Sequence, residues 1–234
     1  MGLKSELAGS VRDIQERIAR ACARAGRDPA GVRLVAVTKG RSLEELKALW
    51  ELGVTDFGEN RVQELTRKAA ALAGEGVAPA WHMIGYLQRN KVKALLDWCR
   101  IIHSLDRLEL GEAVSARAQG GPPVKTLVEV NITGEATKSG VGPEEALALV
   151  RRLARLPGLV VSGLMTMAPA GAGEDECRRV FGSLRQLRDR LAGEEGAGAS
   201  LAELSMGMSQ DFEAAVMEGA TLVRVGRALF QPRG

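Results

Sequence analysis

Apolar residues recur along the chain in two different rhythms. In residues 3–25 they fall at spacings of three and four, which predicts an amphipathic helix with a polar back. From residue 33 onward, short runs rich in Val, Leu and Ile alternate with longer segments that keep the helical spacing. This part of the chain is therefore expected to alternate between strand and helix.

The short runs predict eight strands, and the segments that follow them predict eight helices. The expected strands are residues 33–38, 56–58, 81–85, 101–104, 125–132, 160–165, 201–205 and 221–225. The expected helices are residues 42–52, 60–73, 88–97, 106–118, 143–155, 174–192, 210–218 and 227–230. Helix-start signals support three of them: Ser42 with Glu45 as a capping box, Asp106, and Pro143.

The number of alternations decides the fold class. Eight strand-to-helix repeats in about 200 residues are what a parallel barrel requires. We therefore expect residues 1–234 to form a single (β/α)8 TIM-type barrel domain with an extra N-terminal helix over about residues 3–25. A doubly wound open sheet is the alternative, because the runs at 56–58, 101–104 and 201–205 are short enough to be miscounted. The Gly- and Glu-rich stretch 192–199 predicts a mobile surface loop and not a domain boundary.

Composition and charge exclude several classes of function. The formal net charge is +3, from 32 Lys and Arg against 29 Asp and Glu, and only 3% of residues are aromatic. Such a surface is too weakly basic and too poor in aromatic rings to predict nucleic-acid binding. No run of about 18 apolar residues occurs, so no segment is expected to span a membrane.

Cysteine usage and the N-terminal segment indicate the compartment. Cys22, Cys99 and Cys177 lie far apart without CxxC spacing, which predicts neither a disulfide framework nor a zinc site and suits a reducing environment. Charged residues occur throughout the N-terminal segment, which predicts a helix of the mature protein and not a signal peptide. We expect a cytoplasmic protein.

Lys39 is the first residue with a chemical interpretation. The active face of such a barrel lies at the C-terminal ends of its strands, and Lys39 directly follows the apolar run RLVAVT. A lysine in that place is favoured to lie in a confined, partly desolvated site, where its amine becomes a better nucleophile toward a carbonyl. The alternative is an ordinary strand-end lysine that reaches solvent.

Two glycine turns follow the last two predicted strands. Ser205 and Gly207 lie in SMGMSQDFEAAVMEG, and Gly226 and Arg227 lie in VRVGRALF. Barrels often bind phosphate with the loops after strands seven and eight, where glycine lets the backbone approach and helix N-terminal amides donate. Tight packing alone is the alternative reason for the glycines. Combined with Lys39, these turns predict a cofactor that carries both an aldehyde and a phosphate.

Arg224 lies one residue before the end of the eighth predicted strand. Because side chains alternate along a strand, Arg224 points opposite to Val223 and Val225, so either it or they face the barrel interior. One interpretation is an ion pair with a helix carboxylate. The other places the guanidinium beside a pyridine nitrogen of the cofactor, where it cannot accept a proton and leaves the ring a weak electron sink.

Three further residues are candidates for contacts to that cofactor. Glu59 and Asn60, in FGENRVQE, either orient the lysine or the ring or begin the next helix, and for Glu59 a helix cap is the favoured interpretation. Met165 ends the sixth predicted strand and is a candidate contact, although methionines there are also typical packing residues.

His82 and His103 are the only histidines in the chain. Both lie on apolar runs, where a histidine is more often a core residue with satisfied hydrogen bonds than a metal ligand. The sequence contains neither an HxH pair nor an HExxH motif, so no metal site is expected.

Taken together, the motifs resemble the pyridoxal phosphate homeostasis proteins over nearly the full chain. The likeness is carried by LVAVTK ending at Lys39, FGENRVQE at 57–64, WHMIGYLQRNK at 81–91, IHSLDR at 102–107, VEVNITGEATKSG at 128–140, GLMTM at 163–167 and SMGMSQDFEAAVMEGATLVRVGRALF at 205–230. The resemblance implies a single-barrel version of the alanine racemase fold, in which Lys39 holds pyridoxal 5′-phosphate (PLP) as a Schiff base. It also implies phosphate contacts from Ser205, Gly207, Gly226 and Arg227, with Arg224 beside the ring nitrogen.

The resemblance further implies a non-catalytic role in PLP homeostasis, with PLP-requiring apoenzymes as candidate recipients. Composition predicts no nucleic-acid partner, and the lack of a long apolar patch favours a monomer. Two departures from the family pattern concern the site: Gly40, Arg41 and Ser42 stand where many relatives have a Thr–Lys–Pro type turn, and Arg227 replaces a small hydroxyl residue.

A PLP-dependent racemase or lyase is the first alternative. A racemase needs a second base, and Tyr86 is the single tyrosine. A Schiff base between Lys39 and a sugar phosphate, without PLP, is the second alternative.

Overall fold

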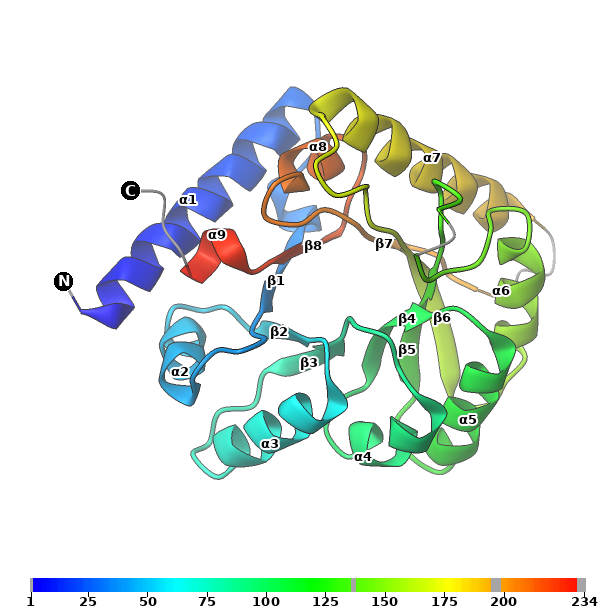
Figure 1. The fold of residues 1–234 in the computed structure, drawn as a ribbon, viewed down its shortest axis with the longest axis horizontal. Coiled ribbons are helices and arrows are strands. Elements are labelled where there is room, and N and C mark those ends of the chain that lie inside the picture. Colours follow the sequence, from blue (N-terminus) through cyan, green and yellow to red (C-terminus); the bar gives the residue numbers. More distant parts are fainter. Residues whose placement is uncertain (1, 136–137, 195–198, 231–234) are drawn as a thin grey trace.

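Eight parallel strands close into a barrel (Figure 1). The computed structural model describes residues 2–135, 138–194 and 199–230. Its strands are β1 (Arg33–Val37), β2 (Asp56–Glu59), β3 (Ala80–Met83), β4 (Ile101–Leu105), β5 (Val124–Glu129), β6 (Leu159–Met165), β7 (Glu203–Ser205) and β8 (Leu222–Val225). Each strand pairs with the next and β8 pairs with β1, so the predicted (β/α)8 barrel is confirmed and the open-sheet alternative is wrong.

The helices lie outside the barrel wall. They are α1 (Leu3–Arg24), α2 (Leu43–Glu51), α3 (Val62–Ala73), α4 (Val92–Leu96), α5 (Leu108–Ala118), α6 (Ala146–Ala154), α7 (Glu174–Gly193), α8 (Phe212–Met217) and α9 (Arg227–Phe230), with 3₁₀ turns at Pro29–Gly31 and Arg89–Lys91. Within the described residues, no helix is long and apolar enough to cross a membrane.

The N-terminal helix α1 covers the seam at which β8 meets β1 (Figure 1). It packs against α2, α8 and α9, because α9 is only one turn long and leaves that part of the wall uncovered. Leu7, Val11 and Ile14 are buried on its inner face. Arg17 ties the helix to α8, donating to Glu213 at 2.8 Å while its guanidinium lies over the ring of Phe212. The extra N-terminal helix of the prediction is confirmed and completes the outer layer.

Alternation of side chains divides the barrel wall into two layers. On β8, Val223 and Val225 pack among the helices, whereas Leu222 and Arg224 point into the barrel. The buried apolar residues of the interior are few, namely Val35, Leu127, Met165 and Leu222. Polar side chains occupy the remaining centre, so the closed sheet holds chemically active groups as well as packing residues.

Two of the three helix-start signals fail. The capping box is confirmed, because Ser42 Oγ accepts from the Glu45 amide while the Glu45 carboxylate accepts from the Ser42 amide. In contrast, Asp106 forms an ion pair with Arg107 and caps nothing. Pro143 lies in a turn, and α6 begins only at Ala146. Asp and Pro occur both at helix starts and in turns, so Asp106 and Pro143 do not by themselves distinguish the two.

Some predicted boundaries also move. The strand predicted over 125–132 ends at Glu129, because the chain then turns back and Val141 donates to the Glu129 carbonyl. The strand predicted over 201–205 begins at Glu203, since Leu201 adopts a positive φ of 42° that interrupts the extended chain. The helix predicted over 88–97 opens as a 3₁₀ turn before α4. Residues 195–198 of the predicted surface loop lie outside the described part of the chain.

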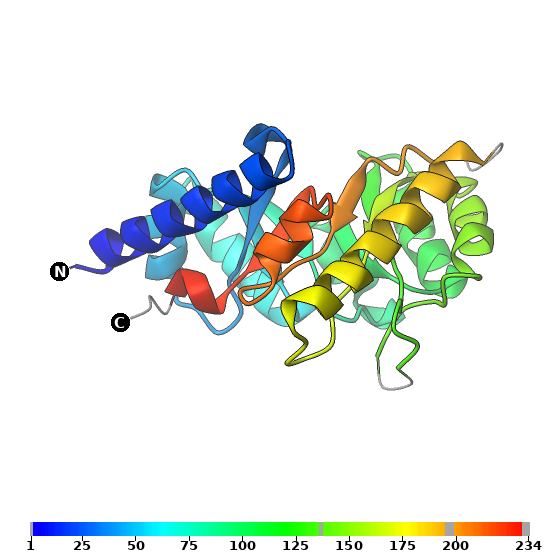
Figure 2. The same cartoon turned by 90° about the horizontal axis from the view of Figure 1, so that it is seen from above.

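The C-terminal ends of the strands share one side of the barrel. Figure 2 shows the loop after β1, the loop after β5 and the approach to α7 together on its lower side. The predicted site residues that directly follow strands are thereby brought to one mouth of the barrel.

Candidate functional site

Lys39 lies in the turn after β1 and its side chain is exposed. Among the described residues, the amine has no hydrogen-bond or ion-pair partner. The expectation of a confined, partly desolvated lysine is therefore wrong. The same observation leaves the amine free to react with a ligand that enters the mouth.

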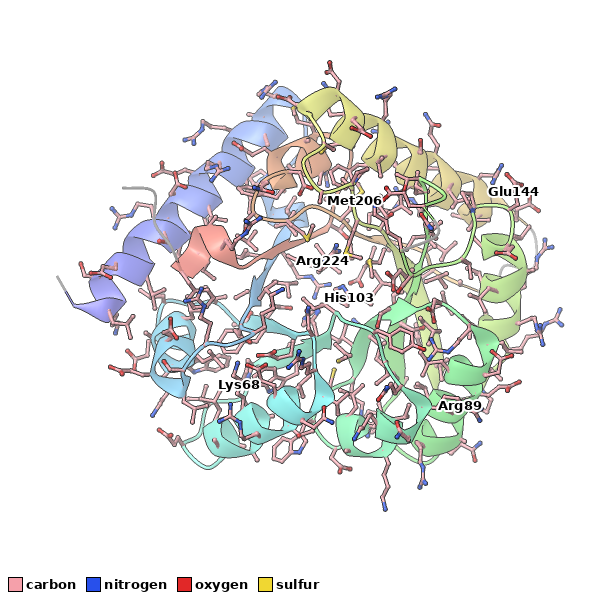
Figure 3. The ribbon with its side chains drawn as sticks, viewed as in Figure 1. Lys68, Arg89, His103, Glu144, Met206 and Arg224 are labelled. Atoms are coloured by element: carbon pink, nitrogen blue, oxygen red, sulfur yellow. The ribbon has the colours of Figure 1, made fainter. Side chains whose placement is uncertain are left out.

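The loop that carries Lys39 is held from beneath by a buried ionic cluster. Lys68 Nζ donates to the Thr38 carbonyl at 2.6 Å, and to Glu59 Oε1 and Glu64 Oε1 at 2.7 Å each. Thr38 Oγ1 donates to the same Glu59 oxygen at 2.7 Å, and the Gly40 amide donates to Glu64 Oε1. Residues on both sides of Lys39 are thus fixed to α3 and β2. We call Thr38, Glu59, Glu64 and Lys68 the Lys68 cluster; Figure 3 labels Lys68.

Glu59 is a member of this cluster and not a helix cap, so that interpretation of the sequence is wrong. It is the last residue of β2, its side chain is 0% exposed, and α3 is preceded by Arg61 without a side-chain cap. Burial raises the pKa of the Glu59 carboxyl, while hydrogen bonds from Lys68 and Thr38 oppose the rise. Its second oxygen, Oε2, is buried with no partner among the described residues, which makes the Lys68 ammonium its main stabilising group.

The two predicted glycine turns are both closely packed. Gly207 has a φ of +91°, and a Cβ there would lie 2.8 Å from the Cα of Phe212 and 2.6 Å from the Cβ of Ala215. At Gly226 a Cβ would lie 3.2 Å from the Cβ of Val37, two residues before Lys39. Glycine at 226 therefore lets the turn after β8 approach the lysine loop.

Ser209 joins the two turns, although the sequence did not single it out. Its hydroxyl oxygen accepts from the amides of Gly226 and Ala228, each at 3.2 Å. Two backbone amides that converge on one oxygen fit an anionic oxygen equally well, which is the arrangement a phosphate requires. Arg227, between them in sequence, is exposed and can supply charge at the same point.

Arg224 points into the barrel, and it is buried (Figure 3). Nη1 donates to Ser205 Oγ at 2.5 Å, and Nη2 donates to the Thr166 carbonyl at 3.0 Å. Burial lowers the pKa of Arg224 to about 10, with the charges of Glu129 and Asp211 opposing, so it stays protonated at neutral pH. No carboxylate pairs directly with it among the described residues, which contradicts the interpretation as a helix ion pair.

Three other predicted contacts occupy different depths. Ser205 is buried inside the barrel, where its hydroxyl bonds Arg224 and His103. Asn60 is half-buried after β2, and its backbone contacts Gly85 so closely that a Cβ on the glycine would lie 2.5 Å from the Asn60 oxygen. Met165 is 1% exposed and packs in the interior apolar group, below the level of the turns.

Both histidines are core residues with satisfied hydrogen bonds, as the sequence predicted. His82 Nδ1 and His103 Nε2 lie 2.8 Å apart, and neither side chain is exposed. Burial lowers the pKa of His103 well below its ordinary value, and the nearby positive groups act in the same direction. Both imidazoles therefore belong to the hydrogen-bonded interior.

Glu129, at the end of β5, is a buried carboxyl that sequence reasoning missed. It is 4% exposed, and burial together with the charge of Asp106 raises its pKa to about 7, while Arg224 opposes. The signal available beforehand was weak: an acidic residue at the end of an otherwise apolar run. Its position near Arg224 places a titratable group beside the candidate site.

Glu129 is expected to make the stability of the ligand-free protein depend on pH. Its folded pKa of about 7 lies above the ordinary value of 4.5, so the folded state binds the extra proton. The free energy of unfolding then falls as pH rises through that window, at a slope of up to about 1.4 kcal/mol per pH unit. Glu129→Gln should flatten this slope in urea unfolding at pH 5, 6, 7 and 8. Glu112→Gln, at an exposed position of α5, is the control; equal slopes in all three proteins contradict the prediction.

Comparison with known proteins finds similarity along almost the whole chain. The model of the alanine racemase N-terminal domain family matches residues 10–233. A pyridoxal phosphate homeostasis protein from Aquifex aeolicus is 43% identical over 221 residues, which are 94% of this chain and 95% of that protein.

Solved structures show the same relationship. An unknown protein from Bifidobacterium adolescentis superposes with a TM-score of 0.88 at 39% identity, covering 97% of this chain and 96% of that one. PipY from Synechococcus elongatus, solved with PLP bound, gives a TM-score of 0.80 at 33% identity, covering 93% of this chain and 99% of that one. The similarity therefore includes the strands and the turns that form the candidate site.

Proposed function

This chain belongs to the alanine racemase N-terminal domain family and, within it, to the pyridoxal phosphate homeostasis proteins, and from that premise we propose that it binds PLP and acts in PLP homeostasis as a carrier or regulator of the free cofactor. The observation that supports this most directly is the unpaired amine of Lys39 on a loop approached by the turn after β8, where the amides of Gly226 and Ala228 converge on one oxygen. When bound, PLP supplies an aldehyde that an amine can hold as a Schiff base and a ring that can act as an electron sink.

Different residues at the mouth are assigned to different parts of PLP. Lys39 would hold the aldehyde as a Schiff base, and the Lys68 cluster would keep its loop in place. Gly207 and Gly226 let the backbone approach the phosphate, and Arg227 adds a positive charge. Packing also favours glycine at both positions, because a Cβ at Gly207 or Gly226 would lie close to neighbouring protein atoms.

The interior residues orient the ring. Arg224 would donate an N–H to the ring nitrogen and, because a guanidinium cannot accept a proton, would leave that nitrogen unprotonated. The Ser205 hydroxyl already bonds Arg224 and His103, so we assign Ser205 to holding Arg224 and not to a hydroxyl contact with phosphate. Asn60 lines the mouth beside β3, and Met165 forms part of its apolar floor.

We further propose that the protein is not an enzyme. An unprotonated ring stabilises a carbanion poorly, and proton transfer at a substrate carbon needs a second base. Tyr86, the single tyrosine, is 57% exposed, and the guanidinium of Arg107 lies 4.7 Å from the centre of its ring. The alternative of a racemase or lyase is tested by incubating the protein with single L-amino acids in D₂O, since either reaction exchanges the α-proton of the amino acid for deuterium. Exchange above background would contradict the non-catalytic assignment.

PLP binding itself is tested by absorbance. Freshly purified protein should show the visible band of a lysine Schiff base, and ligand-free protein should gain it in proportion to added PLP. A colourless protein that does not bind PLP and forms an adduct only with a phosphosugar would support the sugar-phosphate alternative instead.

We also propose that the protein is a cytoplasmic monomer that exchanges PLP with PLP-requiring apoenzymes. Its three cysteines are free thiols buried in the fold, which agrees with a reducing compartment. Delivery is tested by mixing the PLP-loaded protein with a PLP-requiring apoenzyme and comparing the rate of activation with that given by equimolar free PLP.

A further inference from the structure

A continuous line of hydrogen bonds crosses the barrel interior. Asp56 Oδ1 lies 3.0 Å from His82 Nε2, and His82 Nδ1 lies 2.8 Å from His103 Nε2. His103 Nδ1 lies 2.8 Å from Ser205 Oγ, which accepts from Arg224 Nη1 at 2.5 Å. The five residues come from β2, β3, β4, β7 and β8. We call them the interior relay.

The relay joins the two ends of the barrel. At one end Arg224 belongs to the proposed PLP site. At the other end Asp56, the first residue of β2, lines a cavity of about 360 Å³ together with Arg33 and Thr55. His82, His103 and Ser205, between these ends, are completely buried. Figure 3 shows His103 and Arg224 near the centre of the barrel.

The chemistry of the two end groups fixes the direction of donation. Arg224 can only donate, so Ser205 accepts from it and passes its own hydrogen to His103 Nδ1. His103 then carries its proton on Nε2 and donates to His82 Nδ1. His82 in turn carries its proton on Nε2 and donates to Asp56, whose ionised carboxylate can only accept. Starting from Asp56 gives the same order of donors and acceptors. Both ends of the relay therefore require His82 and His103 to be neutral, each with its proton on Nε2.

This order connects a buried cation to a carboxylate without direct contact. Arg224 has no ion-pair partner among the described residues, and the single carboxylate within the relay is Asp56. Burial opposes ionisation of Asp56, yet hydrogen bonds from His82 and Thr55 and the charge of Arg33 lower its pKa overall. Each link polarises the next, because every donor in a chain of hydrogen bonds strengthens the following one in a low-dielectric interior.

We propose that Asp56, His82 and His103 are positioning residues for the cofactor, which set the orientation of Arg224 and the strength of its hydrogen bond to the PLP ring nitrogen. This proposal rests on the proposed function, since it assumes that PLP is the ligand. None of the three residues contacts the mouth itself: they act through Ser205. The protein would then tune the ring nitrogen from a carboxylate at the opposite end of the barrel.

The chain offers an unusually clean test in the ligand-free protein. Its only two histidines both belong to the relay, so every imidazole signal in a ¹⁵N NMR spectrum comes from the relay. We expect both imidazoles to carry a single proton, on Nε2. A spectrum showing an Nδ1–H tautomer at either histidine would overturn the inferred direction, whether or not PLP binds.

The link to the cofactor is tested with PLP labelled with ¹⁵N in its ring. Asp56→Asn keeps an acceptor for His82 but removes the charge, so it should shift the ring ¹⁵N signal of bound PLP and both histidine signals. Glu203→Gln is the matched control, because Glu203 pairs with the same Arg33 at the same end of the barrel but lies outside the relay. A ring signal that is unchanged in Asp56→Asn, or that moves equally in both variants, contradicts the proposal. If the wild-type protein fails to bind PLP, the proposed function fails, and the histidine spectrum alone decides the relay.

Discussion

Lys39→Ala is expected to abolish the covalent PLP adduct while leaving the fold intact. Borohydride reduction traps a lysine Schiff base, so the wild-type protein should carry one modified peptide containing Lys39, and the variant should carry none. Stability should hardly change, within about 0.5 kcal/mol, because Lys39 is exposed and has no side-chain partner among the described residues. Peptide mapping by mass spectrometry and urea unfolding measure the two effects separately.

A second lysine serves as the control for this experiment. Lys47 is half-buried on α2 and, among the described residues, pairs with Glu75, so Lys47→Ala should be trapped as fully as the wild type. The Lys39→Ala protein should still bind PLP, because the turns and Arg224 remain, but its affinity should be lower than that of the wild type. Trapping of Lys39→Ala on the peptide that includes residue 39 would defeat the assignment, and equal labelling of many lysines would show that the reaction is nonspecific.

The barrel could be predicted because its strands carry a local signal. Parallel strands covered by helices are buried on their outer face and read as short apolar runs, and the turn residues after them mark where each ends. Arg224 could be placed inside because alternation on β8 leaves only two choices, and the apolar Val223 and Val225 suit the helix-covered side.

The charged interior could not be derived in the same way. Lys68 and Glu59 are nine residues apart in sequence, and their pairing with Thr38 depends on how α3 lies against β1. A signal did exist: Lys68 falls on the apolar face of α3, beside Leu65 and Leu72, where a charge is expected only when it has a buried partner. The line from His82 to Arg224 joins strands far apart in sequence, so only closure of the barrel brings its members together.

Replacing Lys68 should have the largest effect on stability. Lys68→Met leaves Glu59 buried without its cation and the Thr38 carbonyl without a donor, and breaking a buried ion pair from one side costs about 3–5 kcal/mol. The pKa of Glu59, already raised by burial, should rise further in the variant. Folding then favours the protonated acid, so the destabilisation should be smaller at pH 5 than at pH 8 in urea unfolding.

A double variant separates loss of the ion pair from loss of packing. Lys68→Met combined with Glu59→Gln removes the unpaired charge, so it should recover a large part of the lost stability, and the remaining loss relative to the wild type should depend little on pH. Lys47→Met, at an exposed ion pair, should cost no more than about 1 kcal/mol. Because the Lys68 cluster also holds Thr38 and Gly40 on either side of Lys39, borohydride trapping should slow in Lys68→Met under conditions where the variant is still folded. Trapping at the wild-type rate in a folded Lys68→Met protein would mean that the loop keeps its shape without the cluster, and that the buried charges serve stability alone.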